Sequence, residues 1–218
     1  MENLRIEAET GTSDVELVGH HITGIWMPNP KIVRVGSPRP VAAELLNLDQ
    51  HATGQPFERA ALKFTKKFGP ITIPCQPGLP FRFAAEGWLH SVARLMGAWE
   101  AISNARRRAI PINVPLAEGE YFNFAGGRLT FRTRLLYTFM ALEIASVRSG
   151  LLRKCANVLN PLDGNPRPDF CRTPYFVASD KREKYCSEAC AKVGKRRANL
   201  RWWNENRKGG EDGTQKAR

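Results

Sequence analysis

The stretch that decides the fold covers residues 154–192 and reads KCANVLNPLDGNPRPDFCRTPYFVASDKREKYCSEACAK. It holds four of the chain's five cysteines. Fifteen residues separate Cys155 from Cys171, fourteen separate Cys171 from Cys186, and three separate Cys186 from Cys190. A close cysteine pair at the start of a helix, preceded by an earlier pair, is typical of a tetrahedral zinc site. We therefore predict that these cysteines bind a structural zinc ion.

The second cysteine pair lies between a predicted hairpin and a predicted helix. We expect residues 175–178 to form a strand, 179–182 a polar turn and 183–185 the returning strand. Ser187 then occupies an N-cap position, and Glu188 lies in the first helical turn, where the helix dipole favours a negative charge. The pattern predicts a treble-clef-like finger, with one ligand pair on a loop and the other at a helix N-terminus.

The first cysteine pair is more widely spaced than the two to four residues that usually separate such ligands. Residues 157–168 are rich in Pro, Asn, Asp and Gly, which predicts an inserted loop between the two cysteines. A loop of this kind can return to its starting point, because added length increases the closure entropy only slowly. The alternative is that Cys155 is an ordinary buried thiol, which would leave a three-ligand or metal-free site.

The cysteine count and the hydropathy indicate a cytoplasmic location. An odd number of cysteines, with four of the five clustered, favours metal binding over disulfides and hence a reducing compartment. Cys75 is expected to be a bystander thiol. No apolar run approaches the roughly 20 residues of a membrane span, and residues 1–14 lack the pattern of a signal peptide. We expect no membrane association.

The positive charge is concentrated near the C-terminus. The chain carries a formal charge of +12. Residues 151–218 contain sixteen Lys and Arg against eight Asp and Glu, or +8, which leaves +4 for residues 1–150. Such asymmetry predicts an anionic partner, and nucleic acid first.

The helix that follows Cys190 is expected to continue to about Asn206 and to carry the nucleic-acid contacts. Its cations can neutralise phosphates, and an exposed tryptophan can stack on an unpaired base. The alternative is that the tryptophans belong to a core and the cations only solvate the helix. An apolar stripe that includes Leu200 and Trp203 is expected to pack on the finger or on the rest of the protein. The predicted contact residues are Lys192, Lys195, Arg196, Arg197, Arg201 and Trp202.

The preceding part of the chain predicts helices with a few strands. Residues 1–14 are polar and are expected to be frayed. The fold class that follows is α+β, mostly helical, with an N-terminal α+β domain over residues 1–150, a zinc finger over 151–206 and a disordered tail over 207–218. The periodicity predicts strands over 15–26 and 31–35, a hairpin over 121–124 and 129–132, and helices over 41–48, 56–68, 84–105 and 133–150.

No pattern in the sequence indicates catalysis. A zinc ion with four cysteine ligands has no open coordination position, so it would hold the fold and not activate water. The glycines lack the spacing and context of a phosphate-binding loop, and neither a nucleophile elbow nor histidines at i and i+4 are found. We expect a protein that is not an enzyme.

The motifs around the cysteines resemble the C-terminal finger of bacterial CGNR zinc-finger proteins. The resemblance is carried by KCAN at 154–157, DFCRTPYF at 169–176, KYCSEACAK at 184–192 and the basic segment that contains Trp202 and Trp203. Residues 191–196 read AKVGKR where the name-giving Gly-Asn-Arg motif would stand. The resemblance implies an N-terminal domain of the ABATE type and a role in transcriptional regulation.

Two functions are therefore expected from the sequence. The first is a nucleic-acid-binding regulator with a four-cysteine zinc finger, which binds DNA rather than RNA. The second is a protein-interaction module, in which the finger is only a structural staple and the helix with Trp202 and Trp203, or the N-terminal domain, docks on another protein.

Overall fold

The computed structural model describes residues 4–36, 40–48, 55–104, 121–125, 128–147, 151–157 and 171–211. Within it the chain divides into two compact units, Met1–Leu152 and Arg153–Arg218. We call the first the sheet unit and the second the cysteine unit. No helix in the described residues is both long enough and apolar enough to cross a membrane.

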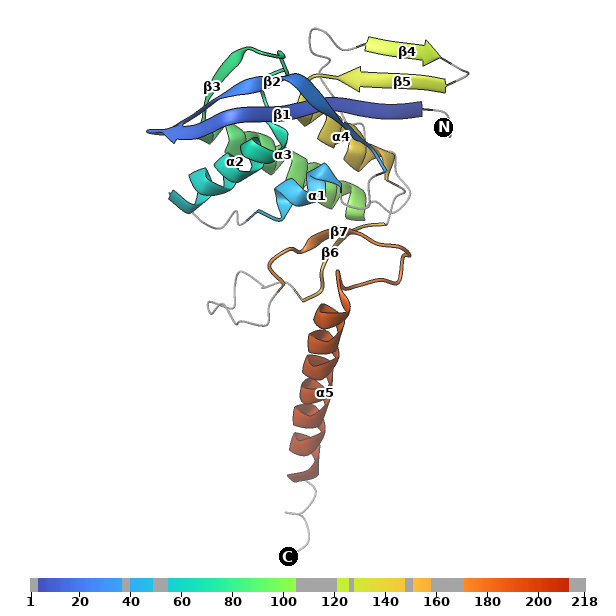
Figure 1. Ribbon diagram of the computed structural model, residues 1–218. Coiled ribbons are helices and arrows are strands. Elements are labelled where there is room, and N and C mark those ends of the chain that lie inside the picture. The colour runs from blue at the N-terminus through green and yellow to red at the C-terminus, as the bar shows by residue number, and fades with distance from the viewer. Residues whose placement is uncertain are drawn as a thin grey trace, which may run out of the picture. The chain divides into compact units, whose positions relative to one another are not determined.

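The sheet unit is built on a five-stranded sheet with the strand order β3-β2-β1-β5-β4. β1 pairs with β5 in parallel, and the other neighbouring strands are antiparallel. Helices α1 to α4 lie on one side of this sheet (Figure 1). The strands are β1 (Leu4–Val18), β2 (His21–Arg34), β3 (Pro80–Ala84), β4 (Tyr121–Ala125) and β5 (Arg128–Thr133). The helices are α1 (Val41–Leu46), α2 (Gln55–Phe68), α3 (Ala85–Asn104) and α4 (Leu136–Ser146).

The sheet corrects two sequence-based expectations. Residues 4–14 are not frayed, because they form most of β1, the central strand of the sheet. Ile6 and Ala8 bury their side chains on one face, while Glu7, on the other face, accepts ion-pair contacts from arginines on β1, β2 and β5. The segment contains charged residues, but these ion pairs compensate the charge of Glu7 and so allow a central position in the sheet. The prediction of a mostly helical protein is also wrong, since this sheet organises the larger unit.

The predicted helices and hairpin of the sheet unit are present. α2 ends at Phe68, where Gly69 has a left-handed φ of 106° and donates its N–H to the Thr65 carbonyl over 2.8 Å. A Cβ on Gly69 would lie 2.5 Å from the Trp26 ring, so only glycine fits this close approach. α4 begins at Leu136, later than predicted, and Thr133 accepts a hydrogen bond from the Leu135 N–H without capping the helix.

The core of the sheet unit lies between the sheet and its helices. Trp26, Trp88, Trp99, Phe139 and Ile144 are all at most 1% exposed. Glu143 of α4 is also buried, and its Oε2 accepts a hydrogen bond from the Ala42 N–H of α1 over 2.8 Å. Burial raises the pKa of Glu143 to about 7, although hydrogen bonds from backbone N–H groups of α1 act in the opposite direction.

In its described residues, the cysteine unit contains two short strands and one long helix. Strand β6 (Leu152–Lys154), which begins at the boundary between the units, pairs with β7 (Tyr175–Val177). The predicted returning strand over 183–185 is wrong: this segment is irregular and the partner of β7 is β6. Helix α5 (Glu188–Glu211) continues past the predicted end, so residues 207–211 are helical and do not belong to a disordered tail. Residues 212–218 lie outside the described part.

Candidate metal centre and basic helix

Four cysteine side chains converge in the cysteine unit. Cys155 follows β6, Cys171 precedes β7, and Cys186 and Cys190 stand just before and within the first turn of α5. Their Sγ atoms all lie within 4.8 Å of one another. Cys171 Sγ is 3.3 Å from Cys186 Sγ, which is 3.7 Å from Cys190 Sγ. Because Zn–S bonds of about 2.3 Å in a tetrahedron place sulfurs about 3.8 Å apart, this group can hold a metal ion.

Backbone hydrogen bonds bring the first two cysteines to the site. The Cys155 N–H donates to the Pro174 carbonyl over 2.7 Å, and the Cys171 N–H donates to the Asn157 carbonyl over 3.0 Å. The inserted loop was predicted over residues 157–168, of which all but Asn157 lie outside the described part. The second bond joins Asn157, at the start of this loop, to Cys171. Cys155 is fully buried and belongs to the group, so the wide spacing of the first pair does not prevent convergence.

A turn and a helix cap present the second pair. Glu183 Oε2 accepts hydrogen bonds from the Ser179 N–H and hydroxyl, at 2.7 and 3.0 Å, which fixes the turn before Cys186. Ser187 Oγ accepts a hydrogen bond from the Cys190 N–H over 3.2 Å. Ser187 is thus the N-cap of α5, as predicted. The cap fixes the start of the helix and with it the position of Cys190.

Two contacts that the sequence did not reveal tie α5 to the rest of the unit. Asn157 is buried, and its Oδ1 accepts a hydrogen bond of 2.6 Å from Arg197 Nη1. A Cβ built on Gly194 would lie 2.2 Å from the Tyr185 hydroxyl, so the helix passes the aromatic ring closely at this glycine. A glycine inside a predicted helix and next to a cysteine site was the available signal for the second contact.

Crowding of the thiols opposes their ionisation when no cation is near. Burial raises the pKa of Cys171 and of Cys186 above the usual range. The neighbouring cysteines raise the pKa of Cys186 further, whereas for Cys171 a hydrogen bond with Cys186 acts in the opposite direction to burial. Burial acts in the same direction on Cys190, but hydrogen bonds from Ser187 and from other cysteines outweigh it, so this pKa lies below its usual value. A divalent cation would supply the charge that all four thiolates need.

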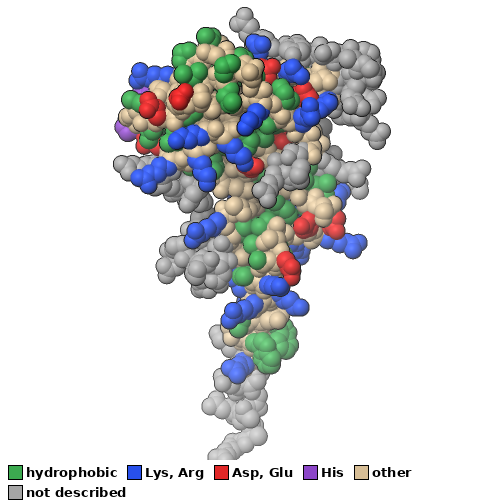
Figure 2. Space-filling model, in the orientation of Figure 1, with side chains coloured by type: hydrophobic (Ala, Val, Ile, Leu, Met, Phe, Trp, Pro, Cys, Tyr) green, Lys and Arg blue, Asp and Glu red, His purple; other side chains and the backbone are tan. Residues whose placement is uncertain are grey.

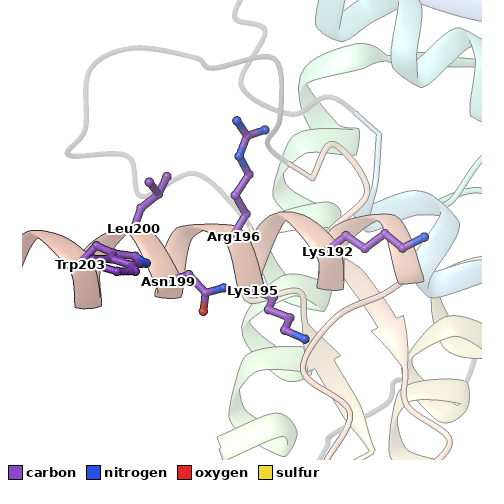
Figure 3. A pocket seen from close by; sticks show the side chains of 6 residues that line it. All are labelled: Lys192, Lys195, Arg196, Asn199, Leu200 and Trp203. Atoms are coloured by element: carbon purple, nitrogen blue, oxygen red, sulfur yellow. The ribbon is translucent and has the colours of Figure 1, made fainter.

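The predicted nucleic-acid contacts fall on different sides of α5. Lys192, Lys195 and Arg196 line an open groove of about 420 Å³ along the helix. Asn199, Leu200 and Trp203 complete this surface, which we call the groove face (Figure 3). Arg197 and Arg201 lie roughly 130° and 170° around the helix axis from the centre of the groove face. Arg197 contacts Asn157 within the unit, as described above.

The tryptophans of α5 are exposed, which corrects one expectation. Leu200 is 55% and Trp203 59% exposed, so this part of the predicted stripe does not pack on the described part of the finger. Trp202, predicted as a contact residue, is 57% exposed and meets Trp203 edge to face with ring centroids 5.3 Å apart. Figure 2 shows hydrophobic side chains exposed along α5 among Lys and Arg side chains. The sequence reasoning left Trp203 and Asn199 out of the contact set.

The fifth cysteine lies apart from this site, in the sheet unit. Cys75 is fully buried, and its N–H donates to the Arg134 carbonyl over 2.7 Å. Burial raises the pKa of this thiol to about 12, which makes it unreactive near neutral pH.

Comparison with known proteins returned nothing: no family model matches the chain, and neither a curated protein nor a solved structure matches it.

Proposed function

We propose that the cysteine unit is a nucleic-acid-binding module in which a structural zinc ion supports a basic helix. The observation that carries this proposal is the groove face of α5, where Lys192, Lys195 and Arg196 line one exposed surface with an indole ring. The partner that best fits three neighbouring cations beside an exposed aromatic ring is a phosphate backbone with bases.

Zinc is the metal that the four-cysteine group fits best. Thiolates are soft ligands, and a tetrahedral set of four is characteristic of structural zinc. Cys155, Cys171, Cys186 and Cys190 would occupy every coordination position. The metal would therefore fix the start of α5, and the exposed side chains would make the contacts with the partner.

The cations of the groove face are available to a ligand. Lys192 forms an ion pair of 2.8 Å with Glu188, but both side chains are more than 75% exposed, so this pair contributes little. Lys195 and Arg196 form no ion pair with any residue in the described ranges. Phosphate groups can replace water around all three without breaking the fold.

The likeness to CGNR fingers extends the proposal to DNA and to transcriptional regulation. It is carried by the motifs around the four cysteines, while AKVGKR at 191–196 replaces the Gly-Asn-Arg motif. Lys192, Lys195 and Arg196 lie within this replaced segment, so the contacts proposed for them come from their position on α5.

Salt dependence of binding tests the proposal. Three phosphate contacts predict that affinity for duplex DNA falls roughly 40-fold between about 50 and 200 mM salt. Fluorescence anisotropy with a labelled duplex would measure it. The Lys195→Ala/Arg196→Ala variant should reduce the slope of log affinity against log salt by about two. A slope near zero in the unaltered protein would contradict the proposal.

Two controls separate the groove face from general positive charge. Lys63→Ala/Lys66→Ala removes the same charge from exposed positions of α2 in the sheet unit. Arg201→Ala removes an exposed cation from the opposite side of α5. Both variants should retain the salt slope of the unaltered protein. An equal loss in either one would mean that net charge, and not the groove face, attracts the nucleic acid.

The exposed apolar side chains favour a second candidate, docking on a protein. Leu200, Trp202 and Trp203 are each more than half exposed on α5. Leu200 and Trp203 lie about 60° apart around the helix axis, so they form one apolar face that can enter a groove of another protein. Such binding would respond weakly to salt, so the experiment above distinguishes the two candidates.

A further inference from the structure

The two tryptophans of α5 present open ring faces next to cations. Trp202 and Trp203 are 57% and 59% exposed, and their rings meet at 82°. In an edge-to-face pair only one face of one ring is covered by its neighbour, so each indole retains at least one open face. These open faces are available to another flat ring.

The cations and the indoles of α5 are close enough for one short nucleic-acid strand to contact both. Arg196 and Trp203 are seven residues apart on α5, which corresponds to roughly 10 Å along the helix axis. Bases stacked in one strand are about 3.4 Å apart, so this distance spans roughly three nucleotides. A single strand can therefore place a base on Trp203 while its neighbouring phosphates reach Arg196 and Lys195.

An unpaired base suits this surface better than a paired one. Bases inside a duplex already stack on both faces, so an indole can reach such a face only by opening the stack, which costs a few kcal/mol per step. Unpaired bases offer their faces without that cost, and aromatic stacking contributes about 1–3 kcal/mol per base.

We infer that the groove face of α5 prefers unpaired nucleotides, with Trp203 as the stacking platform and Lys195 and Arg196 as phosphate contacts. This inference rests on the proposed function and specifies the form of nucleic acid bound. Trp203 is the platform because it borders the groove together with the cations, as Figure 3 shows. Trp202 supports it from the side.

The full-length zinc-loaded protein would be titrated with oligo-dT and with a duplex of equal length at one salt concentration. Intrinsic fluorescence gives an independent readout, since Trp26, Trp88 and Trp99 are buried in the sheet unit and only Trp202 and Trp203 are exposed among the five tryptophans. We expect oligo-dT to bind tighter than the duplex by about tenfold. It should also quench the exposed indoles.

Variants make the inference specific. Trp203→Ala should lower the affinity for oligo-dT roughly tenfold and leave duplex affinity unchanged, while Trp203→Phe should recover part of the loss. Leu200→Ala is the matched control, because Leu200 is 55% exposed on the same groove face but has no ring. It should change either affinity less than about twofold. Zinc content verifies that each variant is folded.

The outcomes separate this inference from the proposed function. Salt-sensitive binding of both nucleic acids with equal affinity, or with equal losses in Trp203→Ala, would overturn the preference for unpaired bases and leave the proposed function standing. Binding of neither nucleic acid would overturn both.

Discussion

The sheet unit and the cysteine unit differ in the interactions that stabilise each of them internally. The sheet unit buries Trp26, Trp88, Trp99 and Phe139 in one core between its sheet and its helices, each at most 1% exposed. Among its described residues, the cysteine unit buries Tyr175 and Ala178 as its largest apolar contribution beside Cys155. A core of that size cannot offset the conformational entropy of folding. Packing is therefore enough to stabilise the first unit, whereas the second depends on the metal that we propose for its four cysteines.

The largest expected effect follows from removing the metal. A structural zinc site contributes about 10–16 kcal/mol to the folding of a small domain. A strong chelator should therefore unfold residues 153–211 and leave the sheet unit folded. Hydrogen exchange read by mass spectrometry should show loss of protection in β7 and α5, but not in β1 or α4. Unchanged protection in α5 would mean that the four thiols need no metal.

A cavity in the apolar core should destabilise the sheet unit without affecting the cysteine unit. Phe139 is fully buried in α4, so Phe139→Ala should destabilise the sheet unit by about 3–5 kcal/mol. Urea denaturation measures the loss, and the zinc content of the variant should stay unchanged. Leu89→Ala is the control, since Leu89 is 43% exposed and its truncation should cost about 0.5 kcal/mol. Release of zinc from Phe139→Ala at low urea would show that the two units do not fold separately.

Acid should affect Glu143 in the sheet unit and the cysteine unit in opposite directions. Because the pKa of Glu143 is raised by folding from 4.5 to about 7, the folded state holds the proton more tightly. Its contribution is fully present below about pH 4.5 and is lost as the pH rises to about 7, by roughly 3 kcal/mol. The cysteine unit should instead lose metal as the pH falls, since protons compete for the thiolates.

Glu143→Gln isolates this dependence. The amide oxygen can still accept the hydrogen bond from the Ala42 N–H, but no charge is buried at any pH. The variant should match the unaltered protein below about pH 4.5 and exceed it in stability near pH 7, as urea denaturation would show. A stability difference that does not vary with pH would exclude the raised pKa.

The smallest expected effect compares two glycines inside helices. A Cβ on Gly97 of α3 meets nothing within 4 Å, so Gly97→Ala should stabilise the sheet unit by up to about 1 kcal/mol. Gly194→Ala should destabilise the cysteine unit by about 1–3 kcal/mol, because the new Cβ would clash with the Tyr185 ring. Weaker zinc affinity, measured by competition with a chromophoric chelator, reports the second effect. Equal stabilisation by both substitutions would contradict the close approach at Gly194.

The sequence predicted local features well and long-range pairing poorly. Ser187 as N-cap and the end of α2 at Phe68 depend on neighbouring residues, and both were predicted. The parallel pairing of β1 with β5 joins residues more than 100 positions apart, so the pattern of residues 4–14 alone did not indicate a central strand. The partner of β7 was missed for the same reason, since β6 lies across the inserted loop.

The same difference between local features and long-range packing applies to the candidate site. Cysteine spacing was enough to select Cys155, Cys171, Cys186 and Cys190, which the structure brings together. It could not say which side of α5 would be covered. Periodicity placed Trp203 on a packing stripe, but no described segment of the cysteine unit covers Trp203, which is 59% exposed.

The most direct test of the metal-centred account is zinc X-ray absorption spectroscopy on the purified protein. Four sulfur neighbours at about 2.3 Å are expected, and Cys155→Ser should replace one of them with a lighter atom. Cys75→Ser, which alters the buried thiol of the sheet unit, should leave the spectrum unchanged. A protein that carries no zinc, or one in which Cys155→Ser leaves all four sulfurs in place, would contradict the account.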